Sequence, residues 1–118
     1  MPREVEQKAV RLVMDFEKRQ GRSPKNVSRA GYDIESSGRL IEVKGMSHPT
    51  GDFIMLYKKL FVKLGRGISN YYIYVVFDIK SKPKLKIIPP EIILANLEIE
   101  TAFSLKAKSY KNIEAIDL

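Results

Sequence analysis

Two short alternating segments joined by a glycine turn place the strongest constraint on the fold of this chain. Apolar and polar residues alternate over residues 31–35 and again over residues 40–45, as they do in strands that have one covered face. The intervening Ser37-Gly38 fits a two-residue hairpin connection. The sequence therefore predicts an antiparallel hairpin in which Ser36 pairs with Arg39.

The register of this hairpin brings acidic side chains together. It places Asp33 directly opposite Glu42, and it puts Glu35 and Lys44 on the same face of the sheet. Carboxylates opposed in this way destabilise a sheet by a few tenths to about 1 kcal/mol. A divalent metal ion between them would remove that repulsion, so the hairpin is a candidate metal site.

The composition indicates one compact domain over residues 1–118. The chain is 44% hydrophobic and 30% charged, which suits a modest core, and 118 residues are too few for two domains. The absence of cysteine excludes disulfides, thiolate metal ligands and thiol nucleophiles. No apolar run approaches the length of a membrane span or of a signal-peptide core, so we expect no membrane association and a cytoplasmic location.

The net charge of +7 favours a polyanionic partner. Nucleic acid, with its phosphates, is the commonest partner of this kind. Lysines scattered over a surface also serve solubility alone, so a protein-interaction or regulatory domain is one alternative. The residues predicted to contact nucleic acid are four basic side chains of the second half, Lys58, Lys59, Lys63 and Arg66.

An amphipathic first helix is predicted from Glu4 to Gln20, where apolar residues recur at helical spacing. Glu6 and Glu17 both lie along one edge of its apolar stripe. Either carboxylate is therefore placed to reach the sheet that the helix covers. The alternative for both is an ordinary solvated side chain, which in the case of Glu17 pairs with the arginines nearby.

The rest of the chain alternates between apolar segments and turn residues. Residues 71–77 form a run of aromatic and β-branched residues too continuous for a half-exposed strand, so we expect them at the centre of the sheet. The other expected elements are strands at 53–56, 84–88 and 97–106, helices at 57–64 and 91–96, and a loosely packed tail after Tyr110.

The order of these elements predicts an α/β fold of the mixed α+β kind. We expect one mixed sheet flanked by helices. The hairpin and residues 53–56 together supply three short strands, which we expect to form a meander between the first two helices.

The acids of the hairpin suit a hard metal ion. Mg²⁺ and Mn²⁺ commonly take one or two carboxylates, and water, a backbone carbonyl or substrate phosphate fills the remaining positions. Asp33 and Glu42 meet this demand, and the carbonyl of Val43 is a candidate third ligand. Glu35 is a further candidate, directly or through water, and Glu6 is a candidate from the helix. The sequence thus predicts a Mg²⁺ or Mn²⁺ site.

Lys44 completes the chemistry that phosphodiester hydrolysis needs. A metal ion polarises the phosphodiester and lowers the pKa of a bound water, so that hydroxide attacks. A protonated Lys44 would stabilise the negative charge that develops on the phosphorane. The alternative is an ordinary surface salt bridge between Lys44 and its neighbours, because Glu-x-Lys is a common tripeptide pattern.

Several motifs in the same order carry a family resemblance. The arrangement resembles the PD-(D/E)xK nuclease superfamily, which has the restriction-endonuclease-like fold. More narrowly, the chain is similar to the NO VEIN C-terminal domain family in four motifs, Val5-Glu6-x-x-Ala9, Glu17-Lys18-x-x-Gly21-Arg22-x-Pro24, Gly31-Tyr32-Asp33-Ile34-Glu35-Ser36 and Ile41-Glu42-Val43-Lys44-Gly45.

This resemblance implies a core with the order αβββαβ, and the residue patterns above add further C-terminal strands. Asp33, Glu42 and Lys44 take the three signature positions of the superfamily, and Glu6 matches the helix glutamate that often assists the metal. The resemblance implies a metal-dependent nuclease that hydrolyses phosphodiester bonds, in DNA rather than RNA. One active site per domain would favour a homodimer for cutting both strands. A non-catalytic nucleic-acid-binding module of the same fold is the other alternative.

Overall fold

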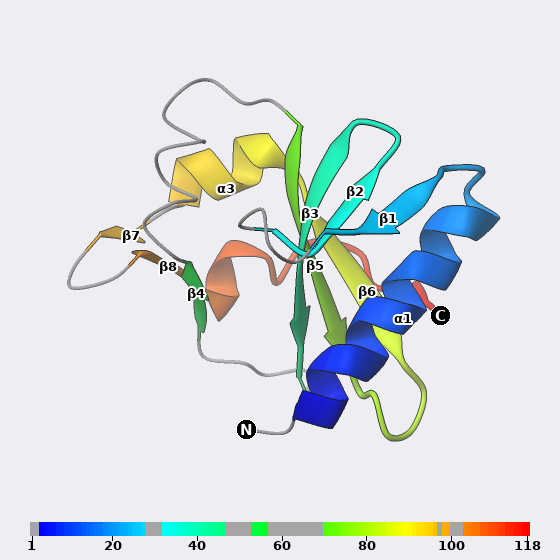
Figure 1. Ribbon diagram of the computed structural model, residues 1–118. Helices are drawn as coiled ribbons and strands as arrows, with labels where there is room; N and C mark the ends of the chain where they lie inside the picture. The colour runs from blue at the N-terminus through cyan, green and yellow to red at the C-terminus, as the bar shows by residue number, and fades with distance from the viewer. Residues whose placement is uncertain (1–2, 28–31, 47–52, 57–69, 97, 100–102) are drawn as a thin grey trace.

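A six-stranded mixed sheet forms the centre of the molecule (Figure 1). The computed structural model describes residues 3–27, 32–46, 53–56, 70–96, 98–99 and 103–118. The strand order is β1-β2-β3-β5-β6-β9, and all neighbours are antiparallel except the parallel pair β3 and β5. These strands are β1 (Pro24–Asn26), β2 (Ile34–Ser36), β3 (Arg39–Gly45), β5 (Tyr71–Phe77), β6 (Lys84–Ile88) and β9 (Ile116–Asp117).

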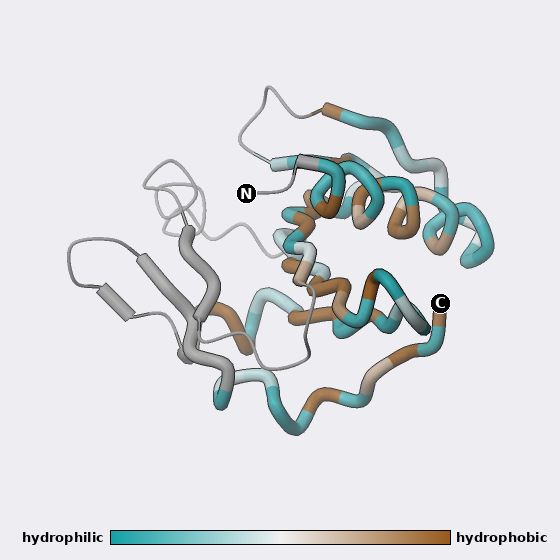
Figure 2. The backbone as a smooth tube through the Cα atoms, turned by 90° about the horizontal axis from the view of Figure 1, so that it is seen from below, coloured by the Kyte–Doolittle hydropathy of each residue, from teal (hydrophilic) through white to brown (hydrophobic). Residues whose placement is uncertain are grey.

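Helix α1 (Arg3–Arg19) covers one face of this sheet and confirms the predicted first helix. Figure 2 shows the apolar residues of α1 turned toward the body of the molecule. Val13 is fully buried against a core that includes Ile41 and Val43 of β3. Acidic residues occupy its first turn and basic residues its last turn, which complements the helix dipole. Within the described ranges, no helix is long and apolar enough to cross a membrane.

A second core lies on the opposite face of the sheet. It contains Tyr71, Ile73 and Val75 of β5 together with Ile93 of α3 (Pro90–Asn96). Because side chains alternate along a strand, β3 contributes to both faces, and its even-numbered residues face this second core. Leu40 packs there.

The predicted hairpin is confirmed, and so is its register over residues 34–36 and 39–41. Ser36 pairs with Arg39 and Ile34 pairs with Ile41. Ser37 has a φ of 47° and the glycine after it has a φ of 91°. Two consecutive positive φ values are typical of the two-residue turns that match the twist of a hairpin, and glycine adopts them without strain.

Glycine is required at the end of β3 for a different reason. A Cβ atom at Gly45 would lie 3.1 Å from Cβ of Ala9 and 3.2 Å from side-chain atoms of both Val5 and Ile79. These distances are tighter than ordinary contacts, so the glycine lets the strand approach the first half of α1 closely. This approach brings the N-terminal part of α1 next to the C-terminal end of β3.

The prediction that residues 71–77 are central is confirmed. Strand β5 lies between β3 and β6, and its residues are buried except for the half-buried Tyr72. The predicted strand at 84–88 and the predicted helix at 91–96 are also present, as β6 and α3.

The predicted three-strand meander is wrong in its third member. Residues 53–56 do form a strand, β4 (Phe53–Leu56), but β4 pairs with β8 (Phe103–Lys106) in a separate three-stranded sheet of order β4-β8-β7. The meander consists of β1, β2 and β3, and β1 was not predicted. Strands adjacent in sequence usually pair, but here β5, which is longer than β4, occupies the free edge of β3.

The C-terminal predictions need two corrections. Residues 97–106 are not one strand, because β7 (Glu98–Ile99) pairs antiparallel with β8, with Ile99 opposite Phe103. The alternation of apolar and polar residues is the same in one long strand and in a hairpin whose second arm continues the alternation of the first. The expected loose tail instead forms β9, which covers the free edge of β6, and the backbone N–H of Leu118 donates to the carbonyl of Pro83 at 3.0 Å.

The predicted single sheet is therefore two sheets. The predicted basic helix at 57–64 lies outside the described residues. The four basic residues expected to contact nucleic acid, Lys58, Lys59, Lys63 and Arg66, lie outside them as well.

Candidate active site

The site is built just before β2 begins, beside the second half of β3. The backbone N–H of Asp33 donates to the carbonyl of Ile41, the residue that pairs with Ile34, at 2.9 Å, which holds Asp33 against β3 next to the regular pairing. The carboxylate oxygen Oδ2 of Asp33 then accepts a hydrogen bond from the backbone N–H of Val43 at 2.7 Å. This bond holds the Asp33 carboxylate beside β3.

Glu42 and Lys44 project from the sheet face that Asp33 shares. Their neighbours Ile41 and Val43 lie in the core beneath α1, so the even-numbered side chains face the other way. Nζ of Lys44 lies 3.1 Å from Oε2 of Glu42, with 22% of the lysine side chain and 14% of the glutamate side chain exposed. The structure therefore brings together the three residues at the predicted signature positions.

The Val43 carbonyl lies on the side of β3 that faces Asp33. Alternate residues of a strand direct their backbone groups to opposite edges. The carbonyl of Ile41 accepts from Asp33, whereas the N–H of Leu40 donates toward the β5 side, to the carbonyl of Asn70. Val43, two residues after Ile41, therefore directs its carbonyl to the same edge as Ile41, beyond Ile34, the first residue of β2.

Glu6 reaches the site from α1, around the end of β3. Its carboxylate accepts a hydrogen bond from the backbone of Gly45 and interacts with the charges of Lys44 and Asp33. Burial is the main reason that the pKa of Glu6 is raised. Of the two helix glutamates considered from the sequence, Glu6 is thus the one that the structure places near Asp33 and Lys44.

Glu42 is a half-buried carboxylate whose negative charge is only partly balanced by a nearby positive charge. Burial is the largest influence, and the nearby negative charge of Asp33 adds to it. Lys44 opposes both effects but does not cancel them, and the pKa of Glu42 is raised to about 7. A cation placed between Asp33 and Glu42 would relieve this repulsion.

This raised pKa predicts a specific dependence of metal-free stability on pH. The folded protein holds the Glu42 proton more tightly than the unfolded chain, whose value is near 4.5. The stabilisation from Glu42 is therefore complete below pH 4.5 and is lost as the pH rises through about 7. The loss is on the order of 3 kcal/mol at most.

Urea unfolding between pH 4.5 and 8 in the presence of a chelator measures this effect. The difference in unfolding free energy between wild type and Glu42→Gln isolates it, because all other titrations are shared. We expect the wild type to lose stability relative to the variant as the pH rises. Parallel curves would contradict the prediction.

Glu35 is placed differently from the other predicted ligands. It pairs with Leu40 rather than with Glu42, and its side chain is exposed. The acids whose charges act on Glu42 are Asp33 and Glu6. Within the described part of the chain, no group of three or more acidic or histidine side chains is arranged to hold a metal ion.

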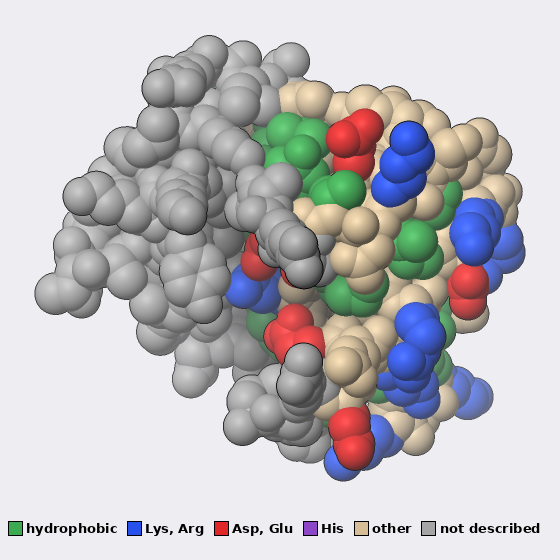
Figure 3. Space-filling view, viewed as in Figure 1, with side chains coloured by type: hydrophobic (Ala, Val, Ile, Leu, Met, Phe, Trp, Pro, Cys, Tyr) green, Lys and Arg blue, Asp and Glu red, His purple; other side chains and the backbone are tan. Residues whose placement is uncertain are grey.

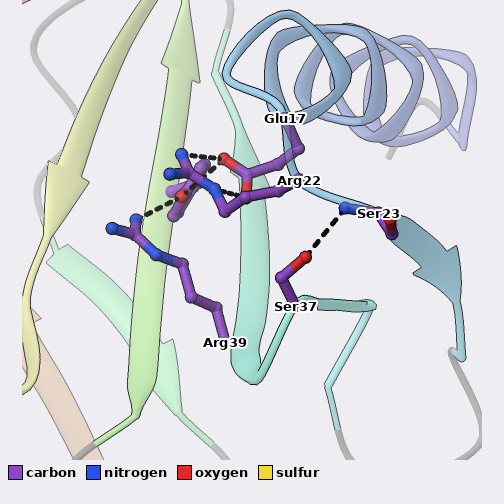
Figure 4. Close-up of polar contacts among 6 residues, drawn as sticks. Glu17, Arg22, Ser23, Ser37 and Arg39 are labelled. Carbon is purple, nitrogen blue, oxygen red and sulfur yellow. Dashed lines mark hydrogen bonds and ion pairs between the residues drawn. The ribbon is translucent and has the colours of Figure 1, made fainter.

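Glu17 lies at the other end of α1, in a buried polar network that the sequence did not predict (Figure 4). The Glu17 carboxylate accepts two hydrogen bonds from Arg22, one of them at 2.7 Å, and one from the hydroxyl of Tyr74 at 2.8 Å. Arg39 donates to the same hydroxyl at 2.8 Å and stacks on the ring of Tyr72. Burial opposes ionisation, but these hydrogen bonds outweigh it and lower the pKa of Glu17.

Of the two alternatives for Glu17, the solvated side chain is therefore wrong and the position toward the sheet is confirmed, and its pairing with Arg22 is present. The helix stripe places Glu17 toward the sheet, where a charged group needs partners. The signal in the sequence was the nearby Arg22, which folds back after α1 ends.

The described surface carries basic side chains in several groups. Figure 3 shows lysine and arginine on one face in separate clusters, interspersed with acidic and hydrophobic side chains.

Comparison with solved structures identifies the class of this fold. The structure of Archaeoglobus fulgidus Hjc, a Holliday junction resolvase from an archaeal hyperthermophile, matches with a TM-score of 0.62 and 17% sequence identity. The match covers 94% of this chain and 91% of that chain. The fold is thus the restriction-endonuclease-like fold, as the sequence motifs predicted.

A family model narrows this assignment. The model described as "Protein NO VEIN, C-terminal" matches residues 5–88, which include both halves of the hairpin and the central strand β5. This chain belongs to that family. No curated protein gives a significant match.

Proposed function

We propose that this protein is a metal-dependent nuclease that hydrolyses phosphodiester bonds in DNA. One observation carries the proposal: the fold brings Asp33, Glu42 and Lys44 onto one face at the end of β3, with Glu42 and Lys44 3.1 Å apart. The fold is shared with a Holliday junction resolvase. The net charge of +7 suits a DNA backbone.

The donor set fits Mg²⁺ or Mn²⁺. The two carboxylates of Asp33 and Glu42 repel each other in the metal-free protein, and this repulsion contributes to the raised pKa of Glu42. They would hold the ion together with the carbonyl of Val43, which lies on the Asp33 side of β3. Glu35 is a candidate only through water, since its exposed side chain lies opposite Leu40. When bound, such an ion polarises a phosphodiester and supplies a nucleophilic hydroxide.

The residues of the chain supply the remaining functions. Glu6 adds a carboxylate within range of Lys44 and Asp33. Lys44 places its ammonium group beside the Glu42 carboxylate, where it would stabilise negative charge on the phosphate. The basic residues Lys58, Lys59, Lys63 and Arg66 are proposed to contact the DNA backbone, and a homodimer would present two sites to a duplex.

Metal titration and DNA cleavage test this function together. We expect wild-type protein to bind Mn²⁺ in a calorimeter, and Glu42→Gln to bind it at least about 10-fold more weakly, because one anionic ligand is lost. With Mg²⁺ or Mn²⁺, wild type should cleave at least one of a four-way DNA junction, a linear duplex and single-stranded DNA. Glu42→Gln should cleave none of them.

The control is Glu91→Gln, an exposed acid in the first turn of α3, which should match wild type in both assays. If wild type binds DNA in a salt-dependent manner but shows neither metal binding nor cleavage, the protein is a binding module of the same fold. If it binds no nucleic acid at all, a protein-interaction role becomes the better account. Cleavage of RNA in preference to DNA would overturn the choice of substrate.

A further inference from the structure

One buried hydroxyl group near the acidic site has no evident role in the folded core. Tyr71 is fully buried, and its hydroxyl has no hydrogen-bond partner among the described residues. A buried polar group without a partner is costly and uncommon in folded proteins, so it calls for an explanation.

Tyr71 lies on the same face of the sheet as the predicted metal ligand Glu42. Tyr71 opens β5 and pairs with Leu40 of β3, and the next residue of β5 on the same face, Ile73, pairs with Glu42. Tyr71 and Glu42 therefore project from the same face of adjacent parallel strands, one diagonal step apart.

The charges of the site act on this hydroxyl. Burial raises the pKa of Tyr71, and the negative charges of Glu42 and then Asp33 raise it further. The phenol consequently stays protonated at neutral pH. It is a hydrogen-bond donor located near two anionic groups, and it is not a base.

Tyr110 shows that burial alone does not bring a tyrosine hydroxyl close to the acidic charges of the site. It belongs to the same core cluster as Tyr71, it is 4% exposed, and its hydroxyl also lacks a partner among the described residues. Burial alone raises its pKa. The two tyrosines are thus buried in the same core cluster, but only Tyr71 lies close enough to Glu42 and Asp33 for their charges to act on its hydroxyl.

We propose that Tyr71 is a positioning residue of the acidic site, whose hydroxyl donates a hydrogen bond to the Glu42 carboxylate when a divalent metal ion is bound. In this structure Glu42 is engaged with Lys44. Carboxylates that ligate metals are generally held by hydrogen bonds of their own, and loss of such a partner weakens metal binding by about 10- to 100-fold. This inference rests on the proposed function.

The test compares Tyr71→Phe with Tyr110→Phe, because each variant removes one orphan hydroxyl from the same core. We expect Tyr71→Phe to weaken Mn²⁺ binding by about 10- to 100-fold in a calorimetric titration, and Tyr110→Phe to leave it unchanged. In the metal-free state the melting temperature of Tyr71→Phe should equal or exceed that of wild type. A purely structural role for the hydroxyl would lower the melting temperature and leave the metal affinity alone.

An NMR titration of the wild-type protein with Mg²⁺ tests the same contact by a second measurement, made on the unaltered site. The ring signals of Tyr71, assigned by their loss in Tyr71→Phe, should shift on metal binding more than those of Tyr110. Unchanged Tyr71 signals in a metal-saturated protein would overturn the inference.

The outcomes separate this inference from the function on which it rests. If wild type binds Mn²⁺ and Glu42→Gln does not, while Tyr71→Phe binds as tightly as wild type, only the role of Tyr71 is overturned. If wild type shows no Mn²⁺ binding with or without DNA, the proposed function and the role of Tyr71 both fail.

Discussion

Replacing Lys44 with methionine is expected to reduce the rate of DNA cleavage by about 100- to 1,000-fold at saturating metal and DNA. Methionine keeps most of the aliphatic length of lysine and removes the charge. The ammonium group lies 3.1 Å from Glu42, so it is positioned beside the atoms that would hold the metal. Loss of a preorganised charge of this kind affects the transition state more than the ground state.

The same substitution should leave Mn²⁺ binding intact or strengthen it. Lys44 is a positive partner of the free Glu42 carboxylate, and a metal ion must compete with it. A loss of cleavage with retained metal affinity therefore separates the role of Lys44 from that of a ligand.

The matched control is Lys80→Met, which removes an exposed lysine from the turn after β5 and should cleave at close to the wild-type rate. Cleavage by Lys44→Met at the wild-type rate would contradict the role proposed for Lys44. Loss of metal binding in Lys44→Met would indicate that its charge maintains the fold of the site instead.

Removing the buried carboxylate of Glu17 is expected to cost about 3–5 kcal/mol of unfolding free energy. Glu17 is fully buried, and it neutralises Arg22 while accepting a hydrogen bond from Tyr74. Glu17→Gln keeps the shape of the side chain but leaves the guanidinium group without its counter-charge. Urea unfolding near pH 7 measures the difference.

Two further variants define the origin of this loss. Glu4→Gln neutralises an exposed acid in the first turn of the same helix and should change stability by no more than about 0.5 kcal/mol. The double substitution Glu17→Met with Arg22→Met removes both charges, and we expect it to be more stable than Glu17→Gln alone, because no unpaired charge is left. Equal stability of Glu17→Gln and Glu4→Gln would contradict a structural role for the ion pair.

The packing of α1 gives its two glutamates different surroundings. Glu6 and Glu17 lie on the same edge of the helix stripe, and the sequence offered no means to choose between them. The structure places Glu6 beside Gly45 and Lys44, and it places Glu17 in a saturated network with Arg22. Glu17→Gln should therefore reduce stability, whereas Glu6 is the carboxylate of α1 that lies near the candidate site.

Local patterns were sufficient for the hairpin, because its register depends on a two-residue turn and on period-2 alternation. Those two signals are enough to place Asp33 next to Glu42. The same signals failed at residues 97–106, where alternation continues through both arms of a hairpin. They also failed at residues 53–56, whose partner β8 lies almost fifty residues further along the chain.

The order of residues along the chain is enough to define the amphipathic first helix, the hairpin, the central position of residues 71–77 and the family to which the chain belongs. Each of these depends on a short-range pattern or on ordered motifs. The packing of distant elements, by contrast, selects which helix glutamate reaches the site, buries Glu17, and brings the hydroxyl of Tyr71 near Glu42 and Asp33. These features depend on which distant strands pair and how closely a helix approaches them, and no local period in the sequence encodes such long-range packing.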